Sequence, residues 1–213
     1  MQFDSFLDII VKIEHLDLLG EVSHSKMSPP YRLELAEKMK EKAKSAKKAG
    51  VMALFYPGYD LQTKLVLILR KTYKGVHSAQ VGFPGGKFEE DDTDLMTTAL
   101  RETQEEIGID AEKVNVIKPM SPLYIPPSNF LVHPFLGIMN EQPIFSKQEE
   151  EVEDILEVSL IDFLDDKSIL TAKVPTSYNI EVEVPAFTLN GHIVWGATAM
   201  MLGELKDLLK QLL

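Results

Sequence analysis

The chain contains no cysteine. This absence excludes disulfides, thiolate nucleophiles and thiolate zinc sites, and it is compatible with a reducing cytoplasm. No apolar run reaches the roughly 18 residues that suggest a membrane span. Residues 1–20 also lack the basic start and small-residue cleavage site of a signal peptide. We therefore expect a cytoplasmic protein without a membrane partner.

Basic residues are outnumbered by acidic ones, with 22 Lys and Arg against 33 Asp and Glu and a formal net charge of −11. Proteins that follow nucleic-acid phosphates usually present basic stripes, so we expect no nucleic-acid partner. A polyanionic ligand would require a metal ion or a local basic cluster to reverse this negative field.

The length of 213 residues suits one compact α/β domain with an added segment. Residues 1–50 contain too little patterned apolar sequence for a core of their own, and we interpret them as an N-terminal helical extension. One amphipathic helix is expected over residues 3–19, followed by a break at residues 28–30. A second helix is expected over residues 31–49, ending before Gly50. Residues 51–213 then form the main domain.

Short strand-like runs alternate irregularly with helices in this domain. The expected strands are residues 51–56, 65–70, 114–117, 132–139, 154–159 and 180–186, and the expected helices are residues 94–107 and 198–212. Turn chemistry at residues 57–60 predicts a hairpin of the first two strands, and residues 82–86 read as a glycine-rich loop. Because no regular βαβ repeat is present, a mixed sheet with packed helices is favoured over a doubly wound parallel sheet.

The helix expected over residues 94–107 ends in a cluster of acids. Its apolar face should carry Met96, Leu100, Thr103 and Ile107, and its opposite face Glu102, Glu105 and Glu106. The three glutamates repel one another and stand at the helix C-terminus, where the macrodipole disfavours negative charge. The arrangement is therefore mildly destabilising unless a cation neutralises it.

Three convergent carboxylates would provide hard oxygen ligands for Mg²⁺ or Mn²⁺, with positions left for water and a substrate phosphate. The simpler alternative is an acidic protein that exposes glutamates on a helix. Arg101 favours the metal site because a guanidinium can orient one of the carboxylates. Gly85 and Gly86 favour it further, because they allow the backbone to approach the helix closely.

Together these residues resemble the Nudix box, which reads glycine, five residues, glutamate, seven residues, then Arg-Glu-aliphatic-x-Glu-Glu-x-Gly-aliphatic. Its second half is matched by Arg101, Glu102, Glu105, Glu106, Gly108 and Ile109. Counting from Gly86, Asp92 stands where the first glutamate is expected, eight residues precede Arg101, and Thr103 holds an aliphatic position. The resemblance implies a mixed α/β fold, a Nudix-type α/β/α sandwich with a mixed sheet. It also implies Mg²⁺ or Mn²⁺ as cofactor, with Glu102, Glu105 and Glu106 as metal ligands.

Before the box, the sequence Leu67-Ile68-Leu69-Arg70-Lys71 is followed by His77, Gln80 and Phe83-Pro84-Gly85-Gly86. These residues resemble the signature of the coenzyme A pyrophosphatase branch, approximately Leu-Leu-x-x-Arg-Ser, a spacer with a second arginine, then His-x-x-Gln-x-x-Phe-Pro-Gly-Gly. Gly75 stands where the second arginine is expected, and the adjacent Lys74 carries a charge without the planar fork of arginine. The resemblance implies substrate contacts from Arg70, Lys71, Lys74, His77, Gln80, Gly85 and Gly86, and from Ser128 and Asn129 after two prolines.

The resemblance thus implies a metal-dependent pyrophosphohydrolase that cleaves coenzyme A or its derivatives to 4′-phosphopantetheine and adenosine 3′,5′-bisphosphate. The catalytic residues would be Arg101, Glu102, Glu105 and Glu151, with either Glu102 or Glu151 as the base. Alternatives are a Nudix hydrolase of ADP-ribose, NADH or a dinucleoside polyphosphate, and a Nudix sensor that binds a nucleotide without cleaving it. The oligomeric state is open, and a homodimer is possible.

Overall fold

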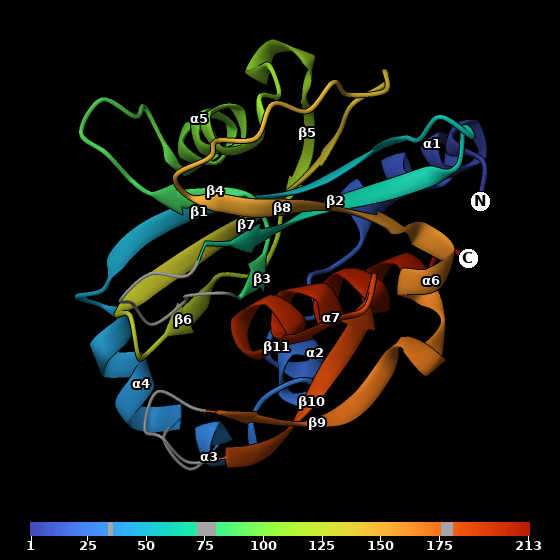
Figure 1. Cartoon of the computed structure of the whole chain (residues 1–213). Helices are drawn as coiled ribbons and strands as arrows, with labels where there is room; N and C mark the ends of the chain where they lie inside the picture. The colour runs from blue at the N-terminus through green and yellow to red at the C-terminus, as the bar shows by residue number, and fades with distance from the viewer. Residues whose placement is uncertain (34–35, 72–79, 176–180) are drawn as a thin grey trace.

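The computed structural model describes residues 1–33, 36–71, 80–175 and 181–213, and its central feature is a mixed sheet (Figure 1). Within these residues the sheet has eight strands, with the path β3-β2-β1-β7-β5 and with β4, β8 and β6 paired to β1, β2 and β7. The strands are β1 (Lys47–Pro57), β2 (Thr63–Arg70), β3 (Val81–Gly82), β4 (Gly85–Lys87), β5 (Asn115–Pro119), β6 (Leu123–Ile125), β7 (Phe130–Ile138) and β8 (Val152–Ser159). β1 runs parallel to β7 and antiparallel to β2 and β4, which confirms the expected mixed sheet and the hairpin.

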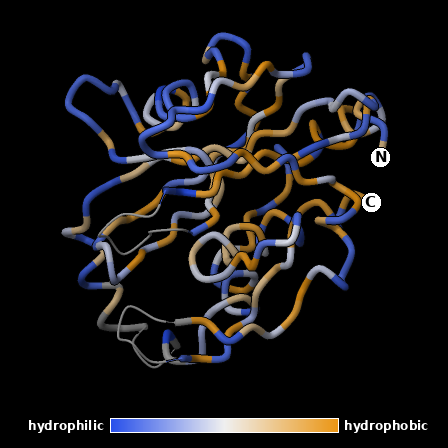
Figure 2. Tube along the Cα trace, viewed as in Figure 1, coloured by the Kyte–Doolittle hydropathy of each residue, from blue (hydrophilic) through white to orange (hydrophobic). Residues whose placement is uncertain are grey.

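Both faces of this sheet are buried. Along β1, Ala53 and Phe55 point into one apolar cluster, and Met52 and Leu54 point into the other. This alternation follows from the two-residue period of a strand. Figure 2 shows hydrophobic residues along the central strands and hydrophilic ones at many of the outer turns. The sheet therefore needs a covering layer on each side.

Helices supply both layers, as Figure 1 shows, with α5 (Leu95–Ile107) on one side of the sheet and α7 (Gly196–Lys210) on the other. The α7 side also receives α1 (Phe3–Ile10), where the Phe6 ring lies 4.9 Å from that of Phe55. After α5 the chain also forms α6 (Leu160–Leu164), the 3₁₀ turns η2 (Ala111–Lys113) and η3 (Asp166–Ser168), and a second sheet of β9 (Ile169–Pro175), β10 (Glu181–Leu189) and β11 (His192–Trp195). The α/β/α sandwich is confirmed.

The N-terminal segment differs from the single helix expected over residues 3–19. α1 ends at Ile10 and continues as the 3₁₀ helix η1 (Val11–His15), and α2 (Glu21–Lys26) begins after Gly20, whose φ is +49°. Phe3, Phe6, Ile10 and Ile13 are buried in the same cluster as the sheet. The segment thus follows the surface of the sheet, which a straight helix of that length would not.

The helix expected over residues 31–49 is wrong in its second half. The structure has α3 (Pro30–Leu33) and α4 (Ala36–Ala43), and β1 already begins at Lys47. Residues Lys47 to Gly50 pair with β7 on one side, and Ala49 and Gly50 also pair with β4. Two ladders of backbone hydrogen bonds outweigh the weak helical preference of this lysine-rich stretch. The division of the chain near residue 50 stays a prediction.

Glu204 connects α7, near the C-terminus, to the N-terminal segment. This buried carboxylate on α7 accepts hydrogen bonds from the Gly20 amide at 2.7 Å and from the Ser121 hydroxyl at 2.6 Å, and it lies 3.4 Å from His24 Nε2. Burial by itself raises the pKa of Glu204, but its contacts with His24, Ser121 and Gly20 outweigh burial and lower the pKa to about 2. The N-terminal segment is thereby fixed to α7.

We expect Glu204→Gln to lower the free energy of unfolding by about 3 kcal/mol at pH 7. A carboxyl with a lowered pKa stabilises the fold above its ordinary pKa of 4.5, and that contribution disappears as pH falls through about 2. Urea titrations between pH 7 and pH 2 should therefore show the two proteins converging at the acid end. The exposed Asp162→Asn serves as the control, and a constant difference across this range would contradict the assignment.

Within the described residues, no helix combines the length and the apolar character needed to cross a membrane.

Candidate active site

Helix α5 lies close to the sheet because β1 presents a glycine beneath it. Asp94 begins the helix by accepting a hydrogen bond from the Thr97 amide at 2.7 Å, and Gly108 ends it with a φ of +76°. A Cβ on Gly50 would lie 2.3 Å from the Leu95 carbonyl oxygen. Only glycine at position 50 allows α5 to pack this closely on β1, so Gly50 helps to set the position of the helix on the sheet.

The buried face of α5 is not the one expected. Its buried residues are Thr98, Ala99, Thr103, Glu106 and Ile107, whereas Met96 is 37% exposed. The prediction that Glu106 lies on the face opposite Thr103 and Ile107 is therefore wrong. The close contact at Gly50 and Ala99 rotates the helix, so that Glu106 faces the sheet.

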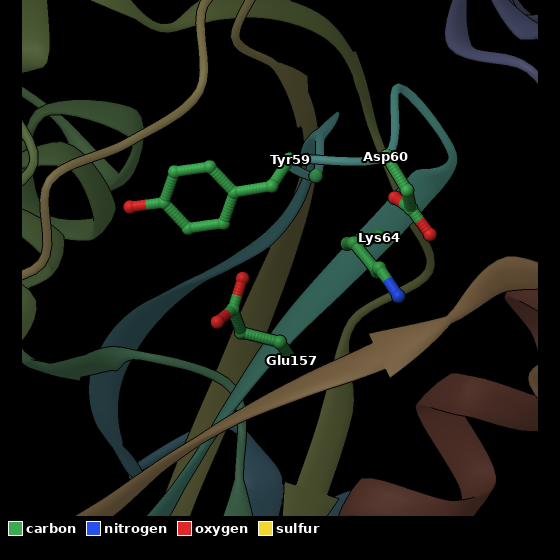
Figure 3. Close-up of a pocket in the computed structure, with 5 residues that line it drawn as sticks. Tyr59, Asp60, Lys64 and Glu157 are labelled. Carbon is green, nitrogen blue, oxygen red and sulfur yellow. The ribbon is translucent and has the colours of Figure 1, made fainter.

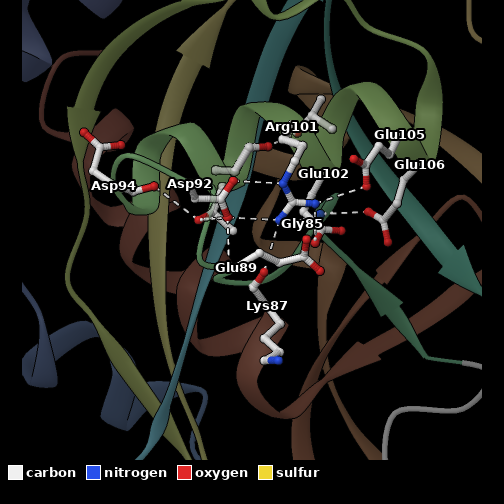
Figure 4. Close-up of polar contacts among 12 residues, drawn as sticks. Gly85, Lys87, Glu89, Asp92, Asp94, Arg101, Glu102, Glu105 and Glu106 are labelled. Atoms are coloured by element: carbon white, nitrogen blue, oxygen red, sulfur yellow. Dashed lines mark hydrogen bonds and ion pairs between the residues drawn. The ribbon is translucent and has the colours of Figure 1, made fainter.

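Arg101 is the hub of the polar contacts in Figure 4. Its Nε and Nη2 donate to the two carboxylate oxygens of Asp92 at 2.9 and 3.0 Å. Its Nη1 donates to Glu102 Oε1 and to Glu105 Oε2, both at 3.1 Å. The paired hydrogen bonds from Arg101 hold the pKa of Asp92 well below its usual range. Asp92 thus anchors the arginine, and the arginine orients two of the three clustered glutamates.

Glu106 is held by the glycine segment and by β2. Its Oε2 accepts a hydrogen bond from the Gly85 amide at 2.8 Å, and its Oε1 lies 3.1 Å from Arg70 Nη2. Gly85 has a φ of +145°, and a Cβ there would lie 2.4 Å from the Gly50 carbonyl oxygen. The expectation that glycines bring backbone amides close to the acidic helix is confirmed at this position.

Burial raises the pKa of two of the glutamates. The side chain of Glu106 is only 2% exposed, and burial raises its pKa to about 7 although Arg70 and the Gly85 amide oppose the shift. Burial also raises the pKa of Glu102, against the effect of Arg101. The charge of Glu151 raises both values further. Perturbed carboxyls in a concave site are a recognised mark of function.

These groups line a pocket of about 290 Å³. Its lining is Arg70, Gly86, Lys87, Glu89, Arg101, Glu102, Glu105, Glu106, Gln148 and Glu151. A Cβ on Gly86 would lie 2.4 Å from the Glu102 carboxylate, so a side chain at this position would displace that group. The pocket therefore combines acids from α5, from the segment between β4 and α5 and from the loop before β8 with two arginines.

The donor set suits a hard divalent cation, since the lining provides carboxylate oxygens and no sulfur or imidazole ligand. Among the described residues, no group of three or more His, Asp or Glu side chains is arranged so that it could hold a metal ion as it stands. Arg101 and Arg70 instead lie against the clustered glutamates. These two guanidinium groups are cations that already reduce the expected repulsion among the glutamates.

Lys71 and Gln80, two further predicted substrate contacts, do not line this pocket. The Lys71 amide donates to the Glu151 carbonyl at 2.8 Å, and the Gln80 carbonyl accepts from the Arg70 amide at 3.0 Å. Both residues thus support the pocket through their backbone. Lys74 and His77 fall outside the described residues.

Ser128 and Asn129 occupy the turn between β6 and β7 and do not line the pocket. Asn129 has a φ of +55°, and its Oδ1 accepts a hydrogen bond from the Tyr124 hydroxyl at 2.9 Å. The Ser128 hydroxyl oxygen is buried without a hydrogen-bond partner in the described structure. Their assignment to substrate binding stays a prediction.

Sequence reasoning missed three residues that line the pocket, Lys87, Glu89 and Gln148. Lys87 and Glu89 lie in the spacer of the box, where the motif specifies no residue type. A signal existed for Gln148, because a side-chain amide just before an acidic run can cap a turn.

A second hollow, of about 340 Å³, lies at the turn between β1 and β2 and is lined by Gly58, Tyr59, Asp60, Lys64 and Glu157 (Figure 3). Tyr59 is 89% exposed, and Glu157 Oε2 accepts a hydrogen bond from the Tyr56 hydroxyl at 3.0 Å. None of the predicted site residues lies there. The pocket at the end of α5 is therefore the candidate active site.

Comparison with known proteins identifies the family. The NUDIX domain model matches residues 47–174, which is more than half of the chain and includes β1, α5 and the loop that carries Glu151. The chain belongs to the Nudix family.

Several curated relatives are similar over this region. Mouse mitochondrial coenzyme A diphosphatase NUDT8 is 34% identical over 129 residues, covering 60% of this chain and 61% of that protein. Arabidopsis thaliana Nudix hydrolase 15, mitochondrial, is 35% identical over 124 residues, covering 57% of this chain and 43% of that protein. An uncharacterized Nudix hydrolase NudL of Yersinia enterocolitica is 39% identical over 100 residues, covering 47% of this chain and 51% of that protein. The chain thus spans about half of the length of the relatives that it matches.

A solved structure agrees on the fold. The MutT/nudix family protein from Enterococcus faecalis superposes with a TM-score of 0.51 at 16% identity, covering 83% of this chain and 68% of that chain. At this identity the likeness concerns the fold alone, and it extends beyond the region matched by the family model.

Proposed function

We propose that this protein is a metal-dependent pyrophosphohydrolase that cleaves the diphosphate of coenzyme A or its derivatives. The observation that carries the proposal is the pocket in which Glu102, Glu105, Glu106 and Glu151 meet Arg70 and Arg101. The similarity to a mitochondrial coenzyme A diphosphatase supports the choice of substrate. The products would be 4′-phosphopantetheine and adenosine 3′,5′-bisphosphate.

The proposed reaction requires no covalent intermediate with the protein. Hydrolysis of a phosphoanhydride requires that a water molecule attack one phosphorus in line, that the bridging P–O bond break, and that charge on the phosphate oxygens be neutralised. Glu102 from α5 and Glu151 from the loop before β8 both line the pocket, and either carboxylate can accept the proton of the attacking water. Arg101 keeps Glu102 and Glu105 in place, and Arg70, the last residue of β2, pairs with Glu106.

A divalent cation, Mg²⁺ or Mn²⁺, fits the donor chemistry of Glu102, Glu105 and Glu106. When bound, such a cation would neutralise diphosphate charge and lower the pKa of a water molecule. In a protein of net charge −11, it would also reverse the negative field that a polyanionic substrate meets.

The proposal is tested with purified protein, Mg²⁺ or Mn²⁺, and a panel of coenzyme A, acyl-coenzyme A, NADH, ADP-ribose and diadenosine polyphosphates, with products identified by mass. We expect rapid cleavage of coenzyme A or acyl-coenzyme A, abolished by a chelator. Cleavage of another member alone would assign a different nucleoside diphosphate derivative as substrate. Tight binding without any product would instead indicate a sensor.

Two of the similar proteins carry mitochondrial names, and a further one is a chloroplastic Nudix hydrolase of Arabidopsis thaliana. The cytoplasmic location and the possible homodimer stay predictions.

A further inference from the structure

The loop before β8 is fastened to the end of α5 by backbone hydrogen bonds. The Ser146 amide donates to the Ile107 carbonyl and the Gln148 amide to the Glu106 carbonyl, both at 3.0 Å. The last carbonyls of a helix have no partner within the helix, so the loop satisfies two of them. Gln148 is thereby fixed beside the backbone of Glu106, whose carboxylate lines the pocket.

The side chain of Gln148 then organises the next turn. Its Oε1 accepts hydrogen bonds from the Glu150 amide at 3.0 Å and from the Glu151 amide at 2.6 Å. Its backbone carbonyl accepts two more, from the Val152 amide at 3.0 Å and from the Glu151 amide at 3.3 Å. A side-chain oxygen that takes two successive amides closes the turn tightly, as a cap does at the start of a helix.

Glu151 is the residue that this turn presents to the pocket. Its carbonyl accepts a hydrogen bond from the Lys71 amide at 2.8 Å, so its backbone is held from the β2 side as well. Its side chain is exposed and shares the pocket lining with Glu102 and Glu106. No hydrogen bond or ion pair to the Glu151 carboxylate is found in the described residues, so its position depends on the backbone beneath it.

We propose that Gln148 is a positioning residue, which holds the Glu151 carboxylate at the pocket by capping the turn between the end of α5 and β8. The inference rests on the proposed function, because it assigns Glu151 a part in diphosphate hydrolysis. Gln148 itself acts through Glu151 and supplies no group to the reaction.

The test compares two replacements of Gln148. Gln148→Met keeps the length of the side chain but removes the acceptor oxygen, whereas Gln148→Asn retains an amide oxygen that can cap the same turn. With the substrate that the wild type cleaves, we expect Gln148→Met to lower kcat by roughly 10- to 100-fold with little change in KM, since a displacement of about 1 Å costs up to about 100-fold. We expect Gln148→Asn to stay near the wild-type value.

A double-mutant cycle separates positioning from general support of the fold. Glu151→Gln alone should lower kcat by about 100-fold or more, and adding Gln148→Met should cost almost nothing further, because the group that it positions is already gone. The inference would be overturned if the kcat loss of the double variant equalled the product of the two single losses. Wild-type turnover in Glu151→Gln would overturn it as well. Glu149→Gln is the matched control, an exposed acid of the same run that does not line the pocket.

Amide hydrogen exchange provides a readout without substrate. In Gln148→Met the Glu150 amide should exchange at least about tenfold faster than in the wild type, because it loses its acceptor. The Glu151 amide should exchange faster by a smaller factor, because it keeps the Gln148 backbone carbonyl at 3.3 Å as an acceptor. Unchanged exchange would overturn the cap. The wild type could also cleave no member of the panel while these amides are protected as expected. That result would overturn the proposed function and the role of Gln148 in it, but the cap would stand.

Discussion

Glu106→Gln is expected to lower kcat for diphosphate hydrolysis by roughly 100- to 1000-fold at saturating Mg²⁺. Glutamine keeps the shape of the side chain and an acceptor for the Gly85 amide, but it removes the negative charge that faces Arg70. Because burial raises the pKa of Glu106 to about 7, the carboxyl is balanced between its two protonation states near neutrality. A cation that requires the charged form would bind far less well to the amide.

Glu105→Gln should lower kcat by a comparable factor, although Glu105 is exposed and, within the described part of the chain, pairs only with Arg101. The control is Glu112→Gln, which removes the same charge from an exposed residue outside the pocket. Steady-state kinetics and the thermal midpoint are measured on all three variants. Wild-type kcat in Glu106→Gln or Glu105→Gln, with an unchanged midpoint, would show that these carboxylates do not take part.

The second large effect concerns stability. Arg101→Ala should lower the free energy of unfolding by about 3–5 kcal/mol, because it leaves the buried carboxylate of Asp92 without its cation. Arg101→Lys should recover only part of this loss, since lysine cannot donate to both oxygens of Asp92 in a planar fork. Urea denaturation at pH 7 measures both variants.

The pairing is tested by adding Asp92→Asn to Arg101→Ala. Removing both charges should cost less than the sum of the single losses, because neither charge is then left buried alone. The difference between wild type and Arg101→Ala should also shrink as pH falls, because the native pKa of Asp92 is lowered and its stabilisation disappears once it binds a proton. Strictly additive losses would contradict the anchoring role.

The sequence predicted the central strands and α5 well because their signals are local. β1 and β2 are continuous apolar runs around a turn, and α5 carries both Asp94 at its start and Gly108 at its end. Residues 47–50 were misassigned because their strand pairing depends on β7, far along the chain. The short β11, with Ile193 exposed, offers too brief a pattern to identify a strand.

The site was predicted unevenly for a similar reason. Motif spacing brought Arg101 and the three glutamates together correctly, because they share one helix. The rotation of α5 was not predictable, since it depends on Gly50 lying beneath the helix. The pairing of Arg70 with Glu106 was also not predicted. It joins β2 to α5, and the residue spacing within β2 or within α5 does not indicate such a contact.

The bond between Gly20 and Glu204 spans 184 residues of sequence. During synthesis, the N-terminal segment must therefore wait for nearly the whole described chain to emerge before it reaches its final partner. The entropy cost of closing such a contact grows only slowly with separation, but contacts between distant residues raise the contact order, and a high contact order slows folding. The contact that fixes the N-terminal segment to α7 is therefore among the last that can form as the chain is synthesised.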